Sequence, residues 1–191
     1  MAQEDAQKDF EAQLEALSQL EAIKREQEDI LAQRKANAPG AVLLSRKAHE
    51  ANKAKLKSDL KKTTAFVGKV KLINTEGLKQ CISDSETLNL TLYISEIVSA
   101  IVKTSFKATD VPSMVKLCVC LHRRYEEFTS GLLPAMASSL LSVLSADDDK
   151  DAGKRKRIQI RFAIELFQAG VWISDEFFPE LLRSLLGKSK S

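Results

Sequence analysis

The amino-acid sequence predicts an all-α protein, and three observations lead to this prediction. Apolar residues recur every three to four positions through most of the chain beyond residue 56, which is the spacing of a helix. Glycine and proline are scarce, with seven and four among 191 residues, so turns are too few for a fold of many short strands. No stretch alternates apolar and polar residues for long enough to compete as a strand. We expect about seven or eight helices joined by short turns.

The first part of the chain is typical of a charged helix. Residues 4–38 contain no glycine or proline and are rich in Ala, Glu, Gln, Lys and Leu. Their apolar residues form two groups that are out of phase, so no sustained heptad seam is expected; the groups are Phe10, Leu14 and Leu17, and Ile23 and Ile30. Pro39-Gly40 marks a break, and a basic helical segment follows. We therefore expect residues 1–55 to form a charged arm, helical or partly disordered, that orders on a partner.

The expected core begins near Leu56 with three helices. The first ends near Asn74, and its apolar stripe is formed by Leu60, Phe66, Val67, Val70 and Ile73. A short second helix carries Leu78, Cys81 and Ile82. Asn89 is the expected N-cap of the third, which carries apolar pairs every four residues: Tyr93, Ile94, Ile97, Val98, Ile101 and Val102. Each stripe needs a neighbouring helix to cover it.

The next helix has the clearest amphipathic pattern. Asp110 is its expected cap, Pro112 lies in its first turn, and its apolar side is formed by Val111, Met114, Val115, Cys118, Leu121, His122 and Tyr125. A turn is expected at Ser130-Gly131. Helical spacing then resumes with Leu132, Leu133, Met136, Leu140, Leu141 and Leu144.

The C-terminal part predicts a loop and two more helices. Residues 146–157 are polar and charged throughout and are expected to form the loop. A central helix follows, apolar on nearly every side and ended by Gly170: Ile158, Ile160, Phe162, Ala163, Ile164, Leu166 and Phe167. Ser174-Asp175-Glu176 supplies a cap for the last helix, which carries Phe177, Phe178, Leu181, Leu182, Leu185 and Leu186.

Successive helices with wide apolar faces favour antiparallel pairs stacked in layers, a HEAT-like α-solenoid. Periodicity alone does not separate this architecture from a four-helix bundle, because no internal repeat is visible. The expected domain covers residues 56–187, with residues 188–191 as a tail.

The charges are unevenly distributed along the chain. Residues 1–38 carry nine acidic and five basic side chains, whereas residues 45–72 carry nine basic and two acidic ones. The remaining residues balance at fifteen of each sign, which leaves a net charge of +3. A basic segment thus lies between an acidic arm and a neutral body. This basic segment could bind RNA or an acidic protein by electrostatic attraction. The alternative is that it forms a solvated helix face without a binding role.

Composition also indicates the compartment in which the protein is expected. The cysteines number three, which does not describe a disulfide framework and indicates a reducing compartment. The N-terminus lacks a basic segment followed by an apolar one, and by sequence we expect no run of apolar residues to be long enough to span a bilayer. We expect a soluble protein that is neither secreted nor membrane-bound.

The sequence offers only incomplete motifs for catalysis or metal binding. Cys118, Cys120 and His122 have the spacing C-x-C-x-H, but on a helix Cys120 points roughly opposite to the other two, so they do not close on one zinc ion. A nucleophile–base pair of Cys118 and His122 would lack an orienting carboxylate. No G-x-x-x-x-G-K-[ST] phosphate loop is present. We expect no enzyme, no cofactor, no metal and no small-molecule substrate.

Two basic clusters are the candidate contacts to RNA phosphates. The first is Lys53, Lys55, Lys57, Lys61, Lys62, Lys69 and Lys71, and the second is Lys154, Arg155, Lys156 and Arg157. Aspartates at 147–149 and 151 offset the second cluster, so the first is the better candidate. Few aromatic side chains accompany either, so contacts would be to phosphates without sequence readout. Two large aromatics that could anchor a partner, Tyr125 and Trp172, are expected in the core.

Four stretches resemble the first middle domain of the up-frameshift protein two family, also called regulators of nonsense transcripts two. They are residues 61–73 (KKTTAFVGKVKLI), 88–111 (LNLTLYISEIVSAIVKTSFKATDV), 117–133 (LCVCLHRRYEEFTSGLL) and 160–176 (IRFAIELFQAGVWISDE). No single stretch is a chemical signature, but their order and approximate spacing fit the family over residues 56–186.

The resemblance implies a HEAT-repeat domain of the initiation-factor-4G middle type in a cytoplasmic, perinuclear scaffold of nonsense-mediated mRNA decay. Its partners would be proteins of the decay machinery, with sequence-independent RNA as a candidate second ligand. In the family this domain continues for several more helices, so the chain is expected to be a fragment, a truncated product or a short homologue, with its last helix uncovered. The alternative is a general RNA-binding or translation-associated HEAT domain that shares only the fold.

Overall fold

The computed structural model describes residues 2–72, 75–105, 107–145 and 152–172, together with Pro179 and Arg183. The helices in the first part are α1 (Ala2–Ala36), α2 (Pro39–Asn52), η1 (Lys53–Lys55), α3 (Leu60–Val70), α4 (Thr75–Thr87) and η2 (Thr91–Tyr93). Those that follow are α5 (Ile94–Lys103), η3 (Ala108–Asp110), α6 (Val111–His122), α7 (Glu126–Ser145) and α8 (Ala152–Gln168). The apolar residues of the expected last helix, with its Ser174–Glu176 cap, lie outside the described residues.

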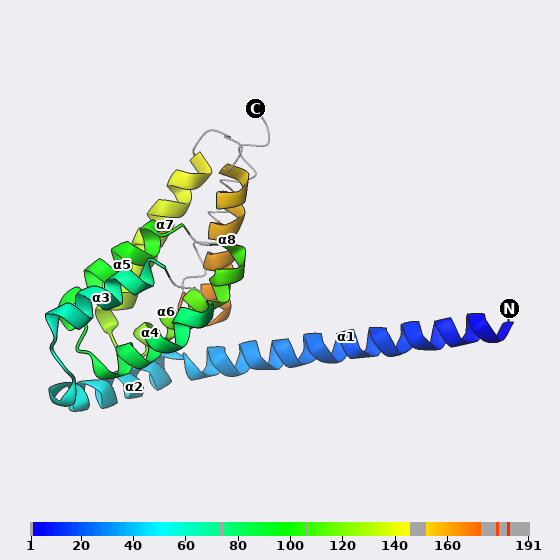
Figure 1. The fold of residues 1–191 in the computed structure, drawn as a ribbon, viewed down its shortest axis with the longest axis horizontal. Helices are drawn as coiled ribbons and strands as arrows, with labels where there is room; N and C mark the ends of the chain where they lie inside the picture. Colours follow the sequence, from blue (N-terminus) through cyan, green and yellow to red (C-terminus); the bar gives the residue numbers. More distant parts are fainter. Residues whose placement is uncertain are drawn as a thin grey trace.

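The helices pack as two layers, which confirms the predicted HEAT-like all-α architecture (Figure 1). In one layer α3 packs on α5 and α5 packs on α7; in the other α4 packs on α6 and α6 packs on α8. Contacts of α3 with α4 and of α7 with α8 join the layers. Within the described residues, the β pairing is a single isolated bridge between Lys57 and Leu88.

One continuous apolar core lies between these layers. Its largest fully buried side chains come from α3, η2's flank and α5 to α8: Phe66, Phe128, Phe162, Leu90, Ile97, Ile101, Met114, Leu117, Leu121, Leu132, Leu140 and Leu166. Tyr125 and Trp172 are buried as well, as predicted. The Tyr125 hydroxyl accepts a hydrogen bond of 3.2 Å from the Leu90 main-chain N–H. This bond joins the residue before η2 to the segment that follows α6. One expected stripe residue, Leu60, is exposed, because it opens α3 at the surface.

Helix α2 packs on the body and does not belong to a free arm. Val42 is buried, and the Arg46 Nε donates to the main-chain oxygen of His122 at 3.1 Å. The His49 ring meets the Tyr125 ring edge-on, with centroids 4.8 Å apart. Just before α2, the Asn37 Nδ2 donates to the Ala169 oxygen at 2.7 Å. These contacts place the start of the packed body near Asn37, earlier than the boundary expected after residue 55.

The expected turn at Ser130-Gly131 is wrong, because α7 runs through it. The helix begins at Glu126 and continues past Pro134 to Ser145. A Cβ at position 131 would lie 3.7 Å from Val98 Cγ2, so this glycine faces α5 at close range. Packing against α5 therefore overrides the local turn signal, since tertiary contacts outweigh a propensity difference of about 1 kcal/mol.

The expected loop over 146–157 is wrong in its second half. Helix α8 begins at Ala152, which is buried, so Lys154 to Arg157 lie in its first two turns. Lysine and arginine are good helix formers, and the buried alanine gives this turn an inner face. Residues 146–151 lie outside the described residues.

Two of the expected caps act differently from the prediction. Asn89 does not cap α5, whose N-cap is Tyr93; the Asn89 Oδ1 instead accepts from the Thr91 N–H at 3.2 Å, at the start of the short helix η2. Asp110 makes no side-chain bond into α6, and its carboxylate instead accepts from the Lys107 N–H at 3.2 Å. In both cases a 3₁₀ turn precedes the α-helix, as is common at helix N-termini, and the predicted capping side chain bonds to this turn and not to the α-helix.

Gly170 ends α8, as predicted, in a left-handed conformation with φ of 77°. The Val171 N–H donates to the Leu166 oxygen and the Gly170 N–H to the Phe167 oxygen, both at 3.0 Å, which is the Schellman arrangement. A Cβ at Gly170 would come within 3.4 Å of the Arg34 backbone. The turn at Gly170 therefore also packs closely against the C-terminal end of α1.

By length and composition alone, one described helix segment, Glu126–Leu144, is apolar enough to cross a membrane, contrary to the expectation from sequence. It belongs to α7 and carries a buried residue at every fourth position: Phe128, Leu132, Met136, Leu140 and Leu144. These residues belong to the protein core, which accounts for the apolar composition of α7.

Candidate functional site: a basic groove at the end of α5

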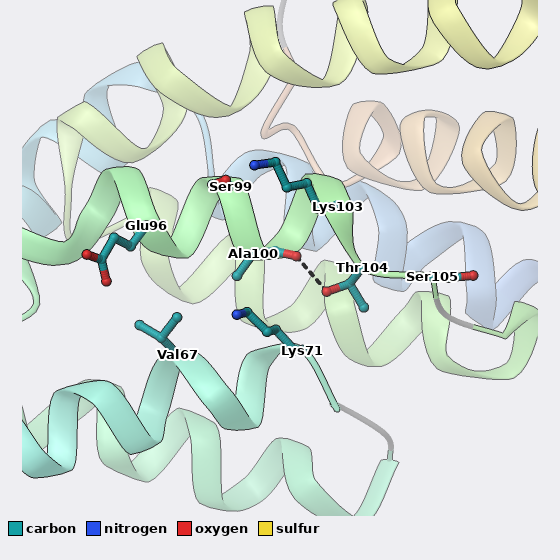
Figure 2. Close-up of a pocket in the computed structure, with 8 residues that line it drawn as sticks. All are labelled: Val67, Lys71, Glu96, Ser99, Ala100, Lys103, Thr104 and Ser105. Carbon is teal, nitrogen blue, oxygen red and sulfur yellow. Dashed lines mark hydrogen bonds between the residues drawn. The ribbon is translucent and has the colours of Figure 1, made fainter.

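A groove of about 510 Å³ runs between α3 and the C-terminal half of α5, and we call it the α5 groove. Its lining residues are Val67, Lys71, Glu96, Ser99, Ala100, Lys103, Thr104 and Ser105. Figure 2 shows the Lys71 side chain reaching from the end of α3 toward α5, with Glu96 at the other end of the groove. The groove is open to solvent and has polar groups along an apolar floor.

A smaller recess of about 160 Å³ continues from the α5 groove toward α8. It shares Lys103, Thr104 and Ser105 with the groove and adds Arg155 from the first turn of α8. The end of α5 therefore carries a continuous depression with a cation from each of three helices or their ends. Those cations are Lys71, Lys103 and Arg155.

Local structure holds the polar groups of this depression in place. The Thr104 hydroxyl donates to the Ala100 oxygen at 2.5 Å, drawn in Figure 2, and the Thr104 N–H bonds the last carbonyls of α5. These hydrogen bonds satisfy carbonyl groups that have no partner within the helix, because they lie in its last turn. Among the described residues that line the depression, the cations are Lys71, Lys103 and Arg155 and the carboxylate is Glu96, so this lining carries an excess of positive charge.

Most members of the first predicted cluster have other roles. Lys53 pairs with Glu50 at 3.2 Å, Lys55 donates to Asn52 at 3.1 Å, and Lys69 pairs with Asp84 at 2.8 Å. The hydrogen bond to Asp84 raises the pKa of Lys69. Lys57 bonds through its main chain to Thr87 and Asn89. Lys61 and Lys62 are exposed on α3, away from the residues that line the groove.

The second predicted cluster divides in a similar way. Arg155 lines the recess, whereas the Arg157 Nε donates to the Gly153 oxygen at 3.1 Å within α8. Lys154 is exposed and Lys156 is half-buried on the same two turns. The structure thus brings Lys71 of the first cluster and Arg155 of the second to one depression.

Lys103, Thr104 and Ser105 line the groove but were not among the residues predicted from the sequence. Lys103 stands alone in the sequence, at the end of an apolar helix, where a cation commonly offsets the helix dipole. Its spacing from either basic cluster gives no signal, because the packing of α3 on α5 is what brings Lys71 and Lys103 to one groove, and the fold is what places Arg155 in the adjoining recess.

The cysteine and histidine residues of α6 serve packing. Cys118 is fully buried, and burial raises the pKa of its thiol, which leaves no reactive thiolate. His122 Nδ1 lies 2.6 Å from the Thr129 hydroxyl. Burial, followed by the charges of Arg46 and Arg123, lowers the pKa of His122 to about 4. In the part of the chain that the structure describes, no three acidic, cysteine or histidine residues gather as metal ligands.

Sequence comparison relates the chain to regulators of nonsense transcripts. It is 31% identical to Regulator of nonsense transcripts UPF2 of Arabidopsis thaliana over 175 residues, which is 90% of this chain. It is 35% identical over 124 residues, 64% of this chain, to Regulator of nonsense transcripts 2 of Homo sapiens. The chain spans 14% and 10% of the length of these relatives. No family model matches it.

Two solved structures share the fold. The first MIF4G domain of human nonsense mediated decay factor UPF2 superimposes with a TM-score of 0.63 and 26% identity, over 86% of this chain and 56% of that domain. The N-terminal mIF4G domain of Upf2 from S. cerevisiae gives a TM-score of 0.59, over 79% of this chain and 50% of that domain. At 21% identity, the second likeness bears on the fold alone.

Proposed function

Because the chain belongs to the family of the UPF2 MIF4G domains, we propose that it is a non-catalytic adaptor of nonsense-mediated mRNA decay. Such an adaptor works by presenting helical surfaces to proteins of the decay machinery. A cytoplasmic, perinuclear location goes with this role and is part of the proposal.

The observation that carries the proposal is the extent of the sequence relation. Identity of 31% over 90% of the chain includes at least part of the acidic arm as well as the stacked helices. A relation that shared only the general HEAT architecture would not require sequence identity over both parts. This extent favours a decay factor over a general HEAT domain.

The chemistry of the described residues supports a binding role over catalysis. Burial raises the pKa of the Cys118 thiol, and the lowered pKa of His122 makes this histidine a weak base whose Nδ1 faces Thr129. Both effects disfavour the nucleophile–base pair that the sequence offered. The α5 groove holds cations and hydroxyl groups, which can bind an anion but do not form a nucleophile–base–orienter set.

A pull-down tests the adaptor role. Tagged protein is incubated with extract of its source cells, with and without ribonuclease, and bound proteins are identified by mass spectrometry. We expect decay factors to be retained after ribonuclease treatment, since the proposed contacts are between proteins. Retention of none of them under either condition would contradict the proposal.

RNA contact through the α5 groove is a second proposed property, and the gathering of Lys71, Lys103 and Arg155 favours it. Side chains from three helices that line one depression can follow a flexible single strand by its phosphates. The small number of cations predicts weak binding that falls as salt rises, without sequence preference.

Charge reversal of the groove tests this second property. We expect the triple variant Lys71→Glu, Lys103→Glu, Arg155→Glu to lower affinity for single-stranded RNA at least tenfold. Its slope of log K against log salt should also be shallower by up to about two, since each phosphate contact contributes about 0.7. Fluorescence anisotropy with a labelled oligonucleotide measures both quantities.

The matched control is Lys61→Glu, Lys62→Glu, which reverses two exposed lysines on α3 that do not line the groove. It should keep most of the affinity and nearly all of the salt slope. Equal losses in the two variants would mean that net charge, and not the groove, governs RNA binding.

A further inference from the structure

The first half of α1 exposes an apolar face. Phe10, Leu14 and Leu17 follow one another at i, i+4 and i+7, and their side chains are between 51% and 61% exposed. Consecutive apolar residues at this spacing are the anchors with which an amphipathic helix binds a groove. A surface helix of a monomer rarely leaves such a stripe open to water.

This face cannot be covered by the body from which its own helix projects. Helix α1 contacts the body near its C-terminal end, where Ile30 and Gln33 line a recess with residues of α6 and α8. At 3.6 residues per turn, Ile30 and Gln33 lie on roughly the opposite side of α1 from the Phe10–Leu17 stripe. Figure 1 shows the N-terminal half of α1 extending away from the stacked helices.

The body carries a groove of matching character between α2 and α7, which we call the α2–α7 groove. It has a volume of about 590 Å³, and its apolar walls are Pro39, Val42, Leu43, Leu133 and Pro134. Leu43 is half exposed and its neighbour Leu44 is 69% exposed, so the apolar surface continues beyond the groove.

The charges of the two surfaces are complementary. The stripe on α1 is flanked by Glu11, Glu15 and Glu21, within a segment of nine acidic and five basic residues. The groove is lined by Arg46 and by one carboxylate, Glu126, and Lys47 lines the adjoining recess. Both cations lie at the start of the segment with nine basic and two acidic residues. Complementary potentials of this kind select partner and register.

We propose that the Phe10–Leu17 face of α1 docks into the α2–α7 groove of a second copy of this chain. Each copy supplies one helix and one groove, so two copies exchange arms in a closed, two-fold symmetric dimer. Helix α1 is straight and leads away from the α2 of its own chain (Figure 1). Its Phe10–Leu17 face can therefore reach the α2–α7 groove of a second copy but not the groove of its own chain. This inference is independent of the decay function proposed above.

Sedimentation equilibrium on the full chain between 1 and 200 µM tests the dimer. We expect a monomer–dimer equilibrium for the wild type. Substitution of either side, by Leu14→Glu with Leu17→Glu or by Leu43→Glu, should weaken dimerisation at least tenfold, because each puts a carboxylate into an apolar contact. The matched control, Leu92→Glu, changes a leucine that is 87% exposed on η2 and should leave the equilibrium unchanged.

Disulfide trapping then identifies which surfaces meet. One chain carries Leu14→Cys and another carries Leu43→Cys; they are mixed and oxidised with oxidised glutathione. We expect covalent heterodimers in the mixture and few homodimers in either chain alone. A wild type that stays monomeric at 200 µM would overturn the proposal. So would a dimer that is lost with the α1 variant but unaffected by Leu43→Glu, because α1 would then pair with something other than the groove.

Discussion

Replacing Phe128 by alanine is expected to lower the free energy of unfolding by about 3–5 kcal/mol. Phe128 is fully buried in the first turn of α7 and belongs to the continuous core. Helix α7 packs on both α5 and α8, so this side chain anchors a helix that is central to the core. The surrounding helices cannot fill the space, because protein interiors are packed at crystal-like density.

Urea unfolding followed by circular dichroism measures the effect. The matched control is Leu141→Ala on the same helix, where the side chain is 45% exposed. Because this leucine is already in contact with water, we expect its loss to cost less than about 1.5 kcal/mol. Similar losses for the two variants would contradict the placement of Phe128 in the core. A change in the slope of the unfolding curve would mean that the variant alters the compactness of the denatured or native state, or departs from two-state unfolding.

Lowering the pH from about 6.5 to about 4 is expected to reduce stability by about 3 kcal/mol through His122 alone. Burial lowers the pKa of this histidine from 6.5 to about 4, and the charges of Arg46 and Arg123 add to the effect. Below pH 6.5 the unfolded chain binds a proton at this site that the folded chain does not bind. Stability is therefore full above pH 6.5, falls as the pH drops, and stops falling from this source below about pH 4.

The contacts of His122 explain why it resists protonation. Its Nδ1 faces the Thr129 hydroxyl at 2.6 Å, and Arg46 from α2 donates to both the His122 oxygen and the Thr129 hydroxyl. A second positive charge would thus lie beside a guanidinium in a buried site. Because Arg46 also attaches α2 to the body, we expect α2 to loosen first as the pH falls.

Comparison with His122→Gln isolates this contribution. Urea unfolding at several values between pH 4 and pH 7.5 should give a shallower pH dependence for the variant, since glutamine does not titrate. Carboxylates titrate in both proteins and cancel in the difference. His49, whose pKa is lowered by burial and by Arg124, provides a second comparison through His49→Gln. Parallel curves for wild type and His122→Gln would refute the assignment.

Helix positions were predictable in this chain because the signal for them is local. The stripe Ile94, Ile97, Val98 and Ile101 marks α5 at the correct place, and Gly170 marks the end of α8. The errors share one cause. At Ser130-Gly131 and over the first turns of α8, the local residues suit a turn or loop, but contacts with other helices stabilise the helical state.

The candidate site was only partly predictable. Lys71 and Arg155 stood out as members of basic runs, and Lys103 did not. Most other members of those runs pair with nearby groups, as Lys69 does with Asp84, and only the folded structure shows this. A basic run in a sequence records charge, whereas binding depends on which charges share a surface.

The sequence by itself determined that this protein is all-α, that an acidic segment precedes a basic one, and that its family is that of the decay factor MIF4G domains. These properties follow from residue spacing, composition and motif order, all of which are read along the chain. Only the tertiary structure decided that α2 belongs to the body, that Lys71, Lys103 and Arg155 line the α5 groove and its adjoining recess, and that α1 and the α2–α7 groove both expose apolar surfaces. The stacking of helices brings together residues far apart in sequence, and no local pattern encodes that proximity.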